Sequence, residues 1–192
     1  LVTSKTVTSN GDGSYTITME AYTTGTVTSS EKSVPVDVVL VLDQSGSMSD
    51  GFSGTTRQAA MKAAVNSFIS NVGDKYSSDA DHRIAIVEFD SGARTVSGWT
   101  FADQSGVAIL QAAINRLDAG GATRVDSGMS EAAELINNPA YSGSNTQRQQ
   151  VVIVFTDGVP TTSSDFETNV ADSAISTALA LKNKGDTVYS VG

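Results

Sequence analysis

The sequence predicts an α/β fold: a doubly wound, mainly parallel central sheet flanked by helices, with an N-terminal β-hairpin arm. Nearly continuous apolar runs rich in Val occur at 36–42, 84–89 and 151–155. Such runs are typical of strands buried on both faces of a parallel sheet. Between them, apolar residues recur at the spacing of amphipathic helices, and strands that alternate with helices imply crossover connections.

The first 34 residues differ from the rest in composition and period. A short β-like run at 5–8 precedes the turn signal at 10–13, and apolar side chains then alternate with polar ones from Tyr15 to Ala21. This pattern predicts a hairpin with one buried face. A further strand is expected at 26–28. Because Pro35 marks a boundary, we expect a β-rich arm over 1–34 and a domain over 35–192.

The elements of the domain alternate in a regular order. Strands are predicted at 36–42, 84–89, 95–100 (at a sheet edge), 151–155 and 187–191, and helices at 61–72, 107–117, 125–136 and 170–181. The sequence finishes on a strand with no covering helix, which we interpret as a domain truncated at its C-terminal end.

Composition excludes several classes of function. Twelve Lys and Arg against 21 Asp and Glu give a net charge of −9, so we expect no attraction to nucleic acid. The absence of Cys excludes disulfides, thiolate metal sites and a cysteine nucleophile. The single histidine, His82, is expected at an exposed strand start. No apolar run of about 18 residues occurs, so we expect no membrane insertion. Ser and Thr make up 47 of the 192 residues, which with zero Cys favours a secreted or bacterial cell-surface protein.

Three polar loops are predicted at one edge of the sheet. Their sequences are Asp43-Gln44-Ser45-Gly46-Ser47, Gly120-Gly121-Ala122-Thr123 and Thr156-Asp157-Gly158. Ligands of open α/β sheets bind outside the carboxyl ends of the strands, where these loops lie. Carboxylate and hydroxyl oxygens are hard donors that suit Mg²⁺, Mn²⁺ or Ca²⁺. The three loops together therefore predict a divalent metal site.

Each loop taken alone has a simpler interpretation. Asp43, Ser45 and Ser47 are also typical of a turn that caps the helix after it. Thr123 is equally suited to capping the helix at 125–136, and Asp157-Gly158 alone is more often a turn than a ligand. Only the combination at one sheet edge favours metal binding over these alternatives.

Asp-x-Ser-x-Ser after an apolar strand, a distant Thr and a Thr-Asp-Gly together resemble the von Willebrand factor type A domain with its metal-ion-dependent adhesion site. The resemblance extends over 36–191, and the chain is similar to the A domains of Gram-positive surface and pilus-tip adhesins. This likeness implies that the arm over 1–34 can be part of a flanking β-sandwich. It implies that Asp43, Ser45 and Ser47 ligate the ion. Thr123 would join directly or through water, and Asp157 would act mainly through a water.

The resemblance also implies that a Glu or Asp of a protein partner completes the coordination, but two positions depart from the family pattern. Thr123 stands one residue further from the glycines than in many members. Asp50 matches the first acidic residue of an adjacent Ca²⁺ site found in integrin-type domains, whereas Gly51 replaces the second. Asp50 is therefore a secondary metal candidate only.

These observations favour a divalent-metal-dependent adhesion module that is not an enzyme, with Mg²⁺ as the expected ion and Mn²⁺ or Ca²⁺ as alternatives. The partner would be a host matrix or surface protein, or another bacterial subunit. Two other functions stay open: a structural stalk module with a vestigial metal site, and a metal-dependent hydrolase that uses Asp43 and Asp157. The hydrolase is less favoured because the motif loops contain no other general base, and no nucleophile elbow or phosphate-binding glycine loop occurs.

Overall fold

The computed structural model describes residues 2–22, 34–78, 80–138, 148–163 and 165–192. By its internal contacts the chain divides into two units, Leu1–Lys32 and Ser33–Gly192. The strand expected at 26–28 lies outside the described residues.

The first unit contains the predicted antiparallel hairpin of β1 (Val2–Ser9) and β2 (Tyr15–Tyr22). Its turn uses Gly11 and Gly13, whose φ angles of 80° and 88° are accessible mainly to glycine. The expectation of a buried face is wrong, because the apolar side chains of this face are all more than half exposed: Val7, Tyr15, Ile17 and Met19. Two strands offer no second layer against which such a face can be buried.

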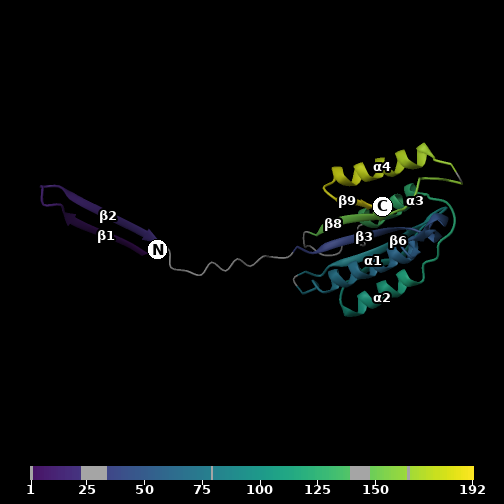
Figure 1. Ribbon diagram of the computed structural model, residues 1–192, viewed down its shortest axis with the longest axis horizontal. Coiled ribbons are helices and arrows are strands. Elements are labelled where there is room, and N and C mark those ends of the chain that lie inside the picture. Colours follow the sequence, from purple (N-terminus) through teal and green to yellow (C-terminus); the bar gives the residue numbers. More distant parts are fainter. Residues whose placement is uncertain (1, 23–33, 79, 139–147, 164) are drawn as a thin grey trace. The chain divides into compact units, whose positions relative to one another are not determined.

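The second unit is built on a five-stranded sheet with the order β7-β6-β3-β8-β9 (Figure 1). The strands are β3 (Val36–Asp43), β6 (Arg83–Phe89), β7 (Ala93–Phe101), β8 (Gln149–Phe155) and β9 (Thr187–Val191). The four strands β6, β3, β8 and β9 are parallel, and β7 pairs antiparallel with β6 at the edge. The predicted fold class and edge strand are thereby confirmed.

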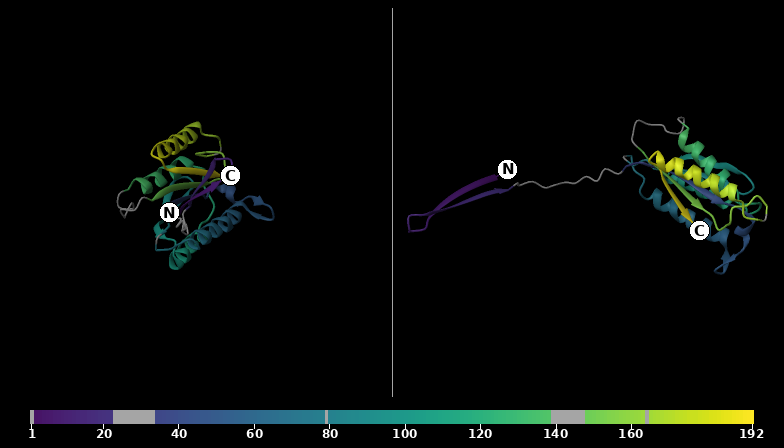
Figure 2. Two further views of the ribbon diagram at one scale, coloured as in Figure 1. Left: turned by 90° about the vertical axis from the view of Figure 1, so that its left-hand side faces the viewer. Right: turned by 90° about the horizontal axis from the view of Figure 1, so that it is seen from above.

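Helices cover both faces of this sheet (Figure 2, left). They are α1 (Arg57–Gly73), α2 (Gln104–Asn115), α3 (Val125–Asn137) and α4 (Thr168–Asn183). The central strand shows why two layers form, because its side chains alternate between faces. Leu40 and Leu42 belong to the core with α1 and α2, whereas Val39 and Val41 belong to the core with α3 and α4. No described helix meets the length and apolarity that a membrane span requires.

The polar segment between β3 and α1 contains three short elements: η1 (Gly46–Ser49), β4 (Gly51–Phe52) and β5 (Thr55–Thr56). Helix α1 begins at Arg57, earlier than the apolar spacing predicts. The Thr56 side chain caps it by accepting a hydrogen bond from the backbone N–H of Ala59 at 3.1 Å. The cap fixes where the helix leaves the carboxyl edge of the sheet.

At the opposite edge, His82 is only 7% exposed, so the expectation of an exposed histidine is wrong. Its Nδ1 accepts a hydrogen bond from the backbone N–H of Val36 at 3.1 Å, at the start of the central strand. Burial lowers the pKa of His82, and the charge of Arg148 lowers it further against the smaller effect of Asp81. The folded protein therefore favours the neutral imidazole.

We expect stability to fall as the pH drops below about 6.5, the ordinary pKa of histidine, because the unfolded chain then binds a proton that folded His82 resists. The variant His82→Asn keeps an acceptor for the Val36 N–H and does not titrate, so its profile should be flatter. The two profiles can diverge by at most about 1.4 kcal/mol per pH unit, the limit for one proton. Urea unfolding between pH 5 and pH 8 measures this, and parallel profiles would contradict the assignment.

Candidate functional site

Backbone hydrogen bonds join two of the three polar loops at the carboxyl edge. The N–H of Gln44 donates to the carbonyl of Phe89 at 2.8 Å, and the N–H of Gly120 donates to the carbonyl of Gln44 at 2.7 Å. The N–H of Gly46 donates to the carbonyl of Gly121 at 3.1 Å. Gly121 has a φ of 85°, and a Cβ there would lie 2.7 Å from the Ser91 hydroxyl, so only glycine allows this approach.

Asp43 ends the central strand as a fully buried carboxylate. Its Oδ1 accepts the backbone N–H of Ser45 at 2.7 Å, and its Oδ2 accepts the hydroxyl of Thr156 at 2.7 Å. Burial raises the pKa of Asp43, these hydrogen bonds oppose the increase, and the negative charge of Asp157 adds to it. Asp43 therefore anchors the Ser45–Ser47 turn and the end of β8 to each other, at an electrostatic cost.

The other four predicted ligands surround one solvent-open hollow of about 340 Å³: Ser45, Ser47, Thr123 and Asp157. The hydroxyls of Ser45 and Ser47 lie 3.2 Å apart, and Ser47 donates to Oδ1 of Asp157 at 2.9 Å. A Cβ on Gly158 would lie 3.5 Å from the Thr123 hydroxyl and 3.7 Å from that of Ser47. The structure thus brings all three loops together around one space.

Asp50 lies apart from this group. It does not line the hollow, its side chain is 66% exposed, and its Oδ2 lies 3.6 Å from Nη1 of Arg57. Within the described part of the chain, no three Asp, Glu, His or Cys side chains cluster in a way that could hold a metal. A divalent site here must therefore use hydroxyl oxygens, as the sequence predicts.

Two further residues belong to the site: Thr156, which the sequence placed in a motif loop without a role of its own, and Arg57, which was missed from the sequence. The Thr156 hydroxyl links Asp43 to the backbone N–H of Gly158, which donates to it at 3.2 Å. Arg57, the first residue of α1, donates from Nη1 to Oδ2 of Asp157 at 2.6 Å. The sequence carried one signal for Arg57, because it is the one basic residue between Lys32 and Lys62.

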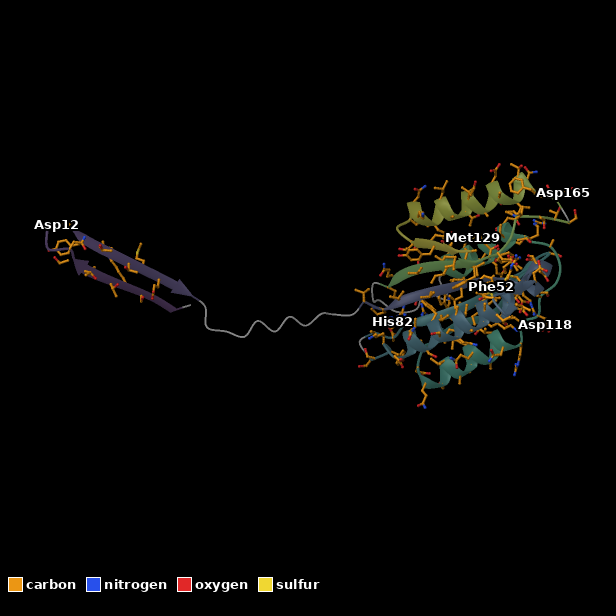
Figure 3. The ribbon with its side chains drawn as sticks, in the orientation of Figure 1. Asp12, Phe52, His82, Asp118, Met129 and Asp165 are labelled. Carbon is orange, nitrogen blue, oxygen red and sulfur yellow. The ribbon has the colours of Figure 1, made fainter. Side chains whose placement is uncertain are left out.

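Mg²⁺, Mn²⁺ or Ca²⁺ fits the residues around this hollow. The donors that line it are three hydroxyls and the Asp157 carboxylate, and the Asp43 carboxylate is bonded to the backbone of Ser45; all are hard oxygen ligands. Among the described residues, none forms a hydrogen bond with the Thr123 hydroxyl, which leaves that oxygen free to ligate. The single histidine is remote: Figure 3 shows His82 at the opposite end of the domain from Asp118 and Asp165, which lie in loops at the carboxyl edge.

The effect of the Asp43 charge on the stability of the protein can be measured without any ligand. Because the folded state resists its ionisation, the metal-free protein should lose stability as the pH rises through the raised pKa of this carboxyl. Asp43→Asn keeps the shape and removes the charge, so in EDTA at pH 7 its unfolding midpoint should lie a few degrees above that of the wild type. The gap should close toward pH 4. A lower midpoint for the variant at pH 7 would contradict this account.

Comparison with known proteins identifies a family that matches most of the second unit. The family model described as "von Willebrand factor type A domain" matches residues 38–159. No curated protein matches the chain significantly in sequence.

Solved structures with the same fold include bacterial pilus proteins. The vWF domain of the type V pili tip protein Mfa5 from Porphyromonas gingivalis is 27% identical, with a TM-score of 0.54, over 67% of this chain and 39% of that chain. The pilus adhesin SpaC from Lactobacillus rhamnosus GG is 18% identical, with a TM-score of 0.66, over 99% of this chain and 28% of that chain.

A von Willebrand factor type A protein from Catenulispora acidiphila is 22% identical, with a TM-score of 0.60, over 93% of this chain and 35% of that chain. This chain thus spans less than two fifths of each of these three structures.

Proposed function

This chain belongs to the von Willebrand factor type A domain family, and we propose that it is a divalent-metal-dependent protein-binding module. The ion would be held by Asp43, Ser45, Ser47 and Thr123, with Asp157 acting through a water. Mg²⁺ is the proposed ion, with Mn²⁺ or Ca²⁺ as substitutes. The observation that carries the proposal is the convergence of three hydroxyls and the Asp157 carboxylate, from three loops, on one hollow that is open to solvent, with buried Asp43 bonded to the backbone of Ser45.

The charges around the hollow support a role in binding a carboxylate. Of the two carboxylates proposed to hold the ion, Asp43 is fully buried, and Arg57 already neutralises Asp157 through a 2.6 Å contact. A doubly charged ion would therefore keep net positive character toward solvent. A Glu or Asp of a protein partner would satisfy that charge as a further oxygen ligand.

The net charge of −9 does not oppose this mode of binding at contact. Exposed charges separated by more than about 8 Å are largely screened at physiological salt, whereas an ion in the hollow meets the partner directly. Long-range repulsion of an acidic partner would slow association, and chelation of the ion would abolish it.

The arrangement favours binding over catalysis. A hydrolase needs a general base near the reacting group, and His82 lies at the far edge of the sheet (Figure 3). We therefore propose no enzymatic activity.

The pilus proteins among the similar structures support a location outside the cell. One is the tip protein of a type V pilus and another is a pilus adhesin, and both contain this fold. We propose that the chain is part of a bacterial surface or pilus protein, in which the hairpin of residues 2–22 belongs to a neighbouring β-module. The metal-dependent domain would contact a host protein or another bacterial subunit.

Thermal unfolding with and without Mn²⁺ tests the proposal. A ligand at 100 times its dissociation constant stabilises by about 2.7 kcal/mol. For a domain of this size that corresponds to a midpoint increase of roughly 5–11 °C, at about 2–4 °C per kcal/mol. We expect this increase in the wild type, its reversal by EDTA, and its absence in Asp43→Asn.

The matched control is Asp118→Asn, which removes an exposed carboxylate at the same edge that does not line the hollow. This control should respond to Mn²⁺ like the wild type. An equal response of Asp43→Asn and the wild type would place the ion elsewhere. No response of the wild type, together with no heat of binding at millimolar metal, would leave the stalk module as the better account.

A further inference from the structure

A positive side chain stands inside the proposed metal site. Nη1 of Arg57 lies 2.6 Å from Oδ2 of Asp157 and 3.6 Å from Oδ2 of Asp50. The same nitrogen lies 3.5 Å from the carbonyl oxygen of Ser47. From the start of α1, one guanidinium thus contacts both the segment that carries Ser47 and Asp50 and the loop after β8.

The ion pair between Arg57 and Asp157 lies where partial burial strengthens its electrostatic attraction. The Asp157 side chain is only 13% exposed and that of Arg57 is 37% exposed, so the pair is partly shielded from water. The second oxygen of Asp157 is already used by the Ser47 hydroxyl. Both oxygens of Asp157 are therefore engaged, and Arg57 competes with an ion, or with a water bound to an ion, for the negative charge of this carboxylate.

We propose that Arg57 sets the metal affinity of the site, by holding Asp157 in the metal-free protein and by repelling a divalent cation in the hollow. This inference rests on the proposed function. Asp43 and Asp157 bring two negative charges to the loops, and the positive charge of Arg57 offsets one of them. The ion thus meets one net negative charge in place of two.

This arrangement links metal binding to the partner. With Arg57 present, a site that holds a divalent ion carries a net positive charge, which a carboxylate from outside neutralises. Metal alone therefore binds weakly, and metal together with an acidic partner binds well. Arg57 converts a metal site into one whose occupancy depends on the presence of a carboxylate ligand.

The dissociation constant for Mn²⁺, measured by titration calorimetry on the whole chain, tests the inference. Arg57→Gln should bind Mn²⁺ about tenfold more tightly than the wild type, because repulsion between a unit charge and a doubly charged ion across a few ångströms is of that order even in water. Arg57→Lys keeps the charge and should stay within about threefold of the wild type.

Two further variants serve as controls. Arg57→Met gives a second neutral side chain that keeps apolar contacts, since Arg57 also lines a groove with Met48, Phe52 and Met61. Arg94→Gln removes a guanidinium that is 73% exposed and paired with Glu88, outside the hollow. Arg94→Gln should leave the dissociation constant for Mn²⁺ unchanged.

Thermal unfolding in EDTA supplies a readout without metal. Arg57→Gln should melt about 2–4 °C below the wild type there, because the loss of its partner leaves Asp157 partly buried and uncompensated. If Arg57→Gln is less stable than the wild type without metal but binds Mn²⁺ more tightly, Arg57 acts as a cation that competes with the metal. If Arg57 had only a structural role, its replacement would lower both the stability and the affinity for Mn²⁺.

The outcomes distinguish the two hypotheses. Unchanged or weaker Mn²⁺ binding by both Arg57→Gln and Arg57→Met, with normal binding by the wild type, would overturn the role of Arg57 and leave the proposed function standing. No Mn²⁺ binding by any of these chains at millimolar concentration would overturn the proposed function, and the role of Arg57 with it.

Discussion

A buried negative charge at the end of the central strand is the constraint on which the carboxyl edge depends. Asp43 is fully buried, and a carboxylate in such a place must be satisfied by hydrogen bonds or by a cation. The Ser45 N–H and the Thr156 hydroxyl supply the hydrogen bonds. These contacts shape the Ser45–Ser47 turn and fix it to the end of β8. The position of the hydroxyls around the hollow therefore follows from the need to solvate one carboxylate.

Close packing of α3 against the sheet makes this arrangement of loops possible. A Cβ on Gly128 in α3 would lie 2.8 Å from the ring of Phe89 and 2.9 Å from Val41, so the helix approaches the sheet as only glycine permits. This approach places the loop before α3 beside the loop after β3, where Gly121 accepts the Gly46 N–H. The central strand thus serves two purposes, since its apolar side chains join both cores and its last residue organises the site.

Much of this could be predicted from the sequence, because strands buried on both faces need uninterrupted apolar runs such as 36–42 and 151–155. Predicting the loops at one edge required only the rule that parallel strands end together. The contacts made by single charged side chains were not predictable. The partner of Arg57 depends on which loop reaches it across about a hundred residues of sequence, and no local pattern encodes that. His82 looked exposed for the same reason, since its acceptor nitrogen is used by Val36, far away in the chain.

The most direct test of the account is a crystal structure grown with Mn²⁺, with anomalous diffraction used to locate the ion. We predict a single strong peak in the hollow, at about 2.0–2.6 Å from the hydroxyl oxygens of Ser45 and Ser47, the range for hard divalent cations and oxygen ligands. A peak away from these oxygens, or none at a concentration that saturates the thermal response, would contradict the claim that the three loops form a metal site.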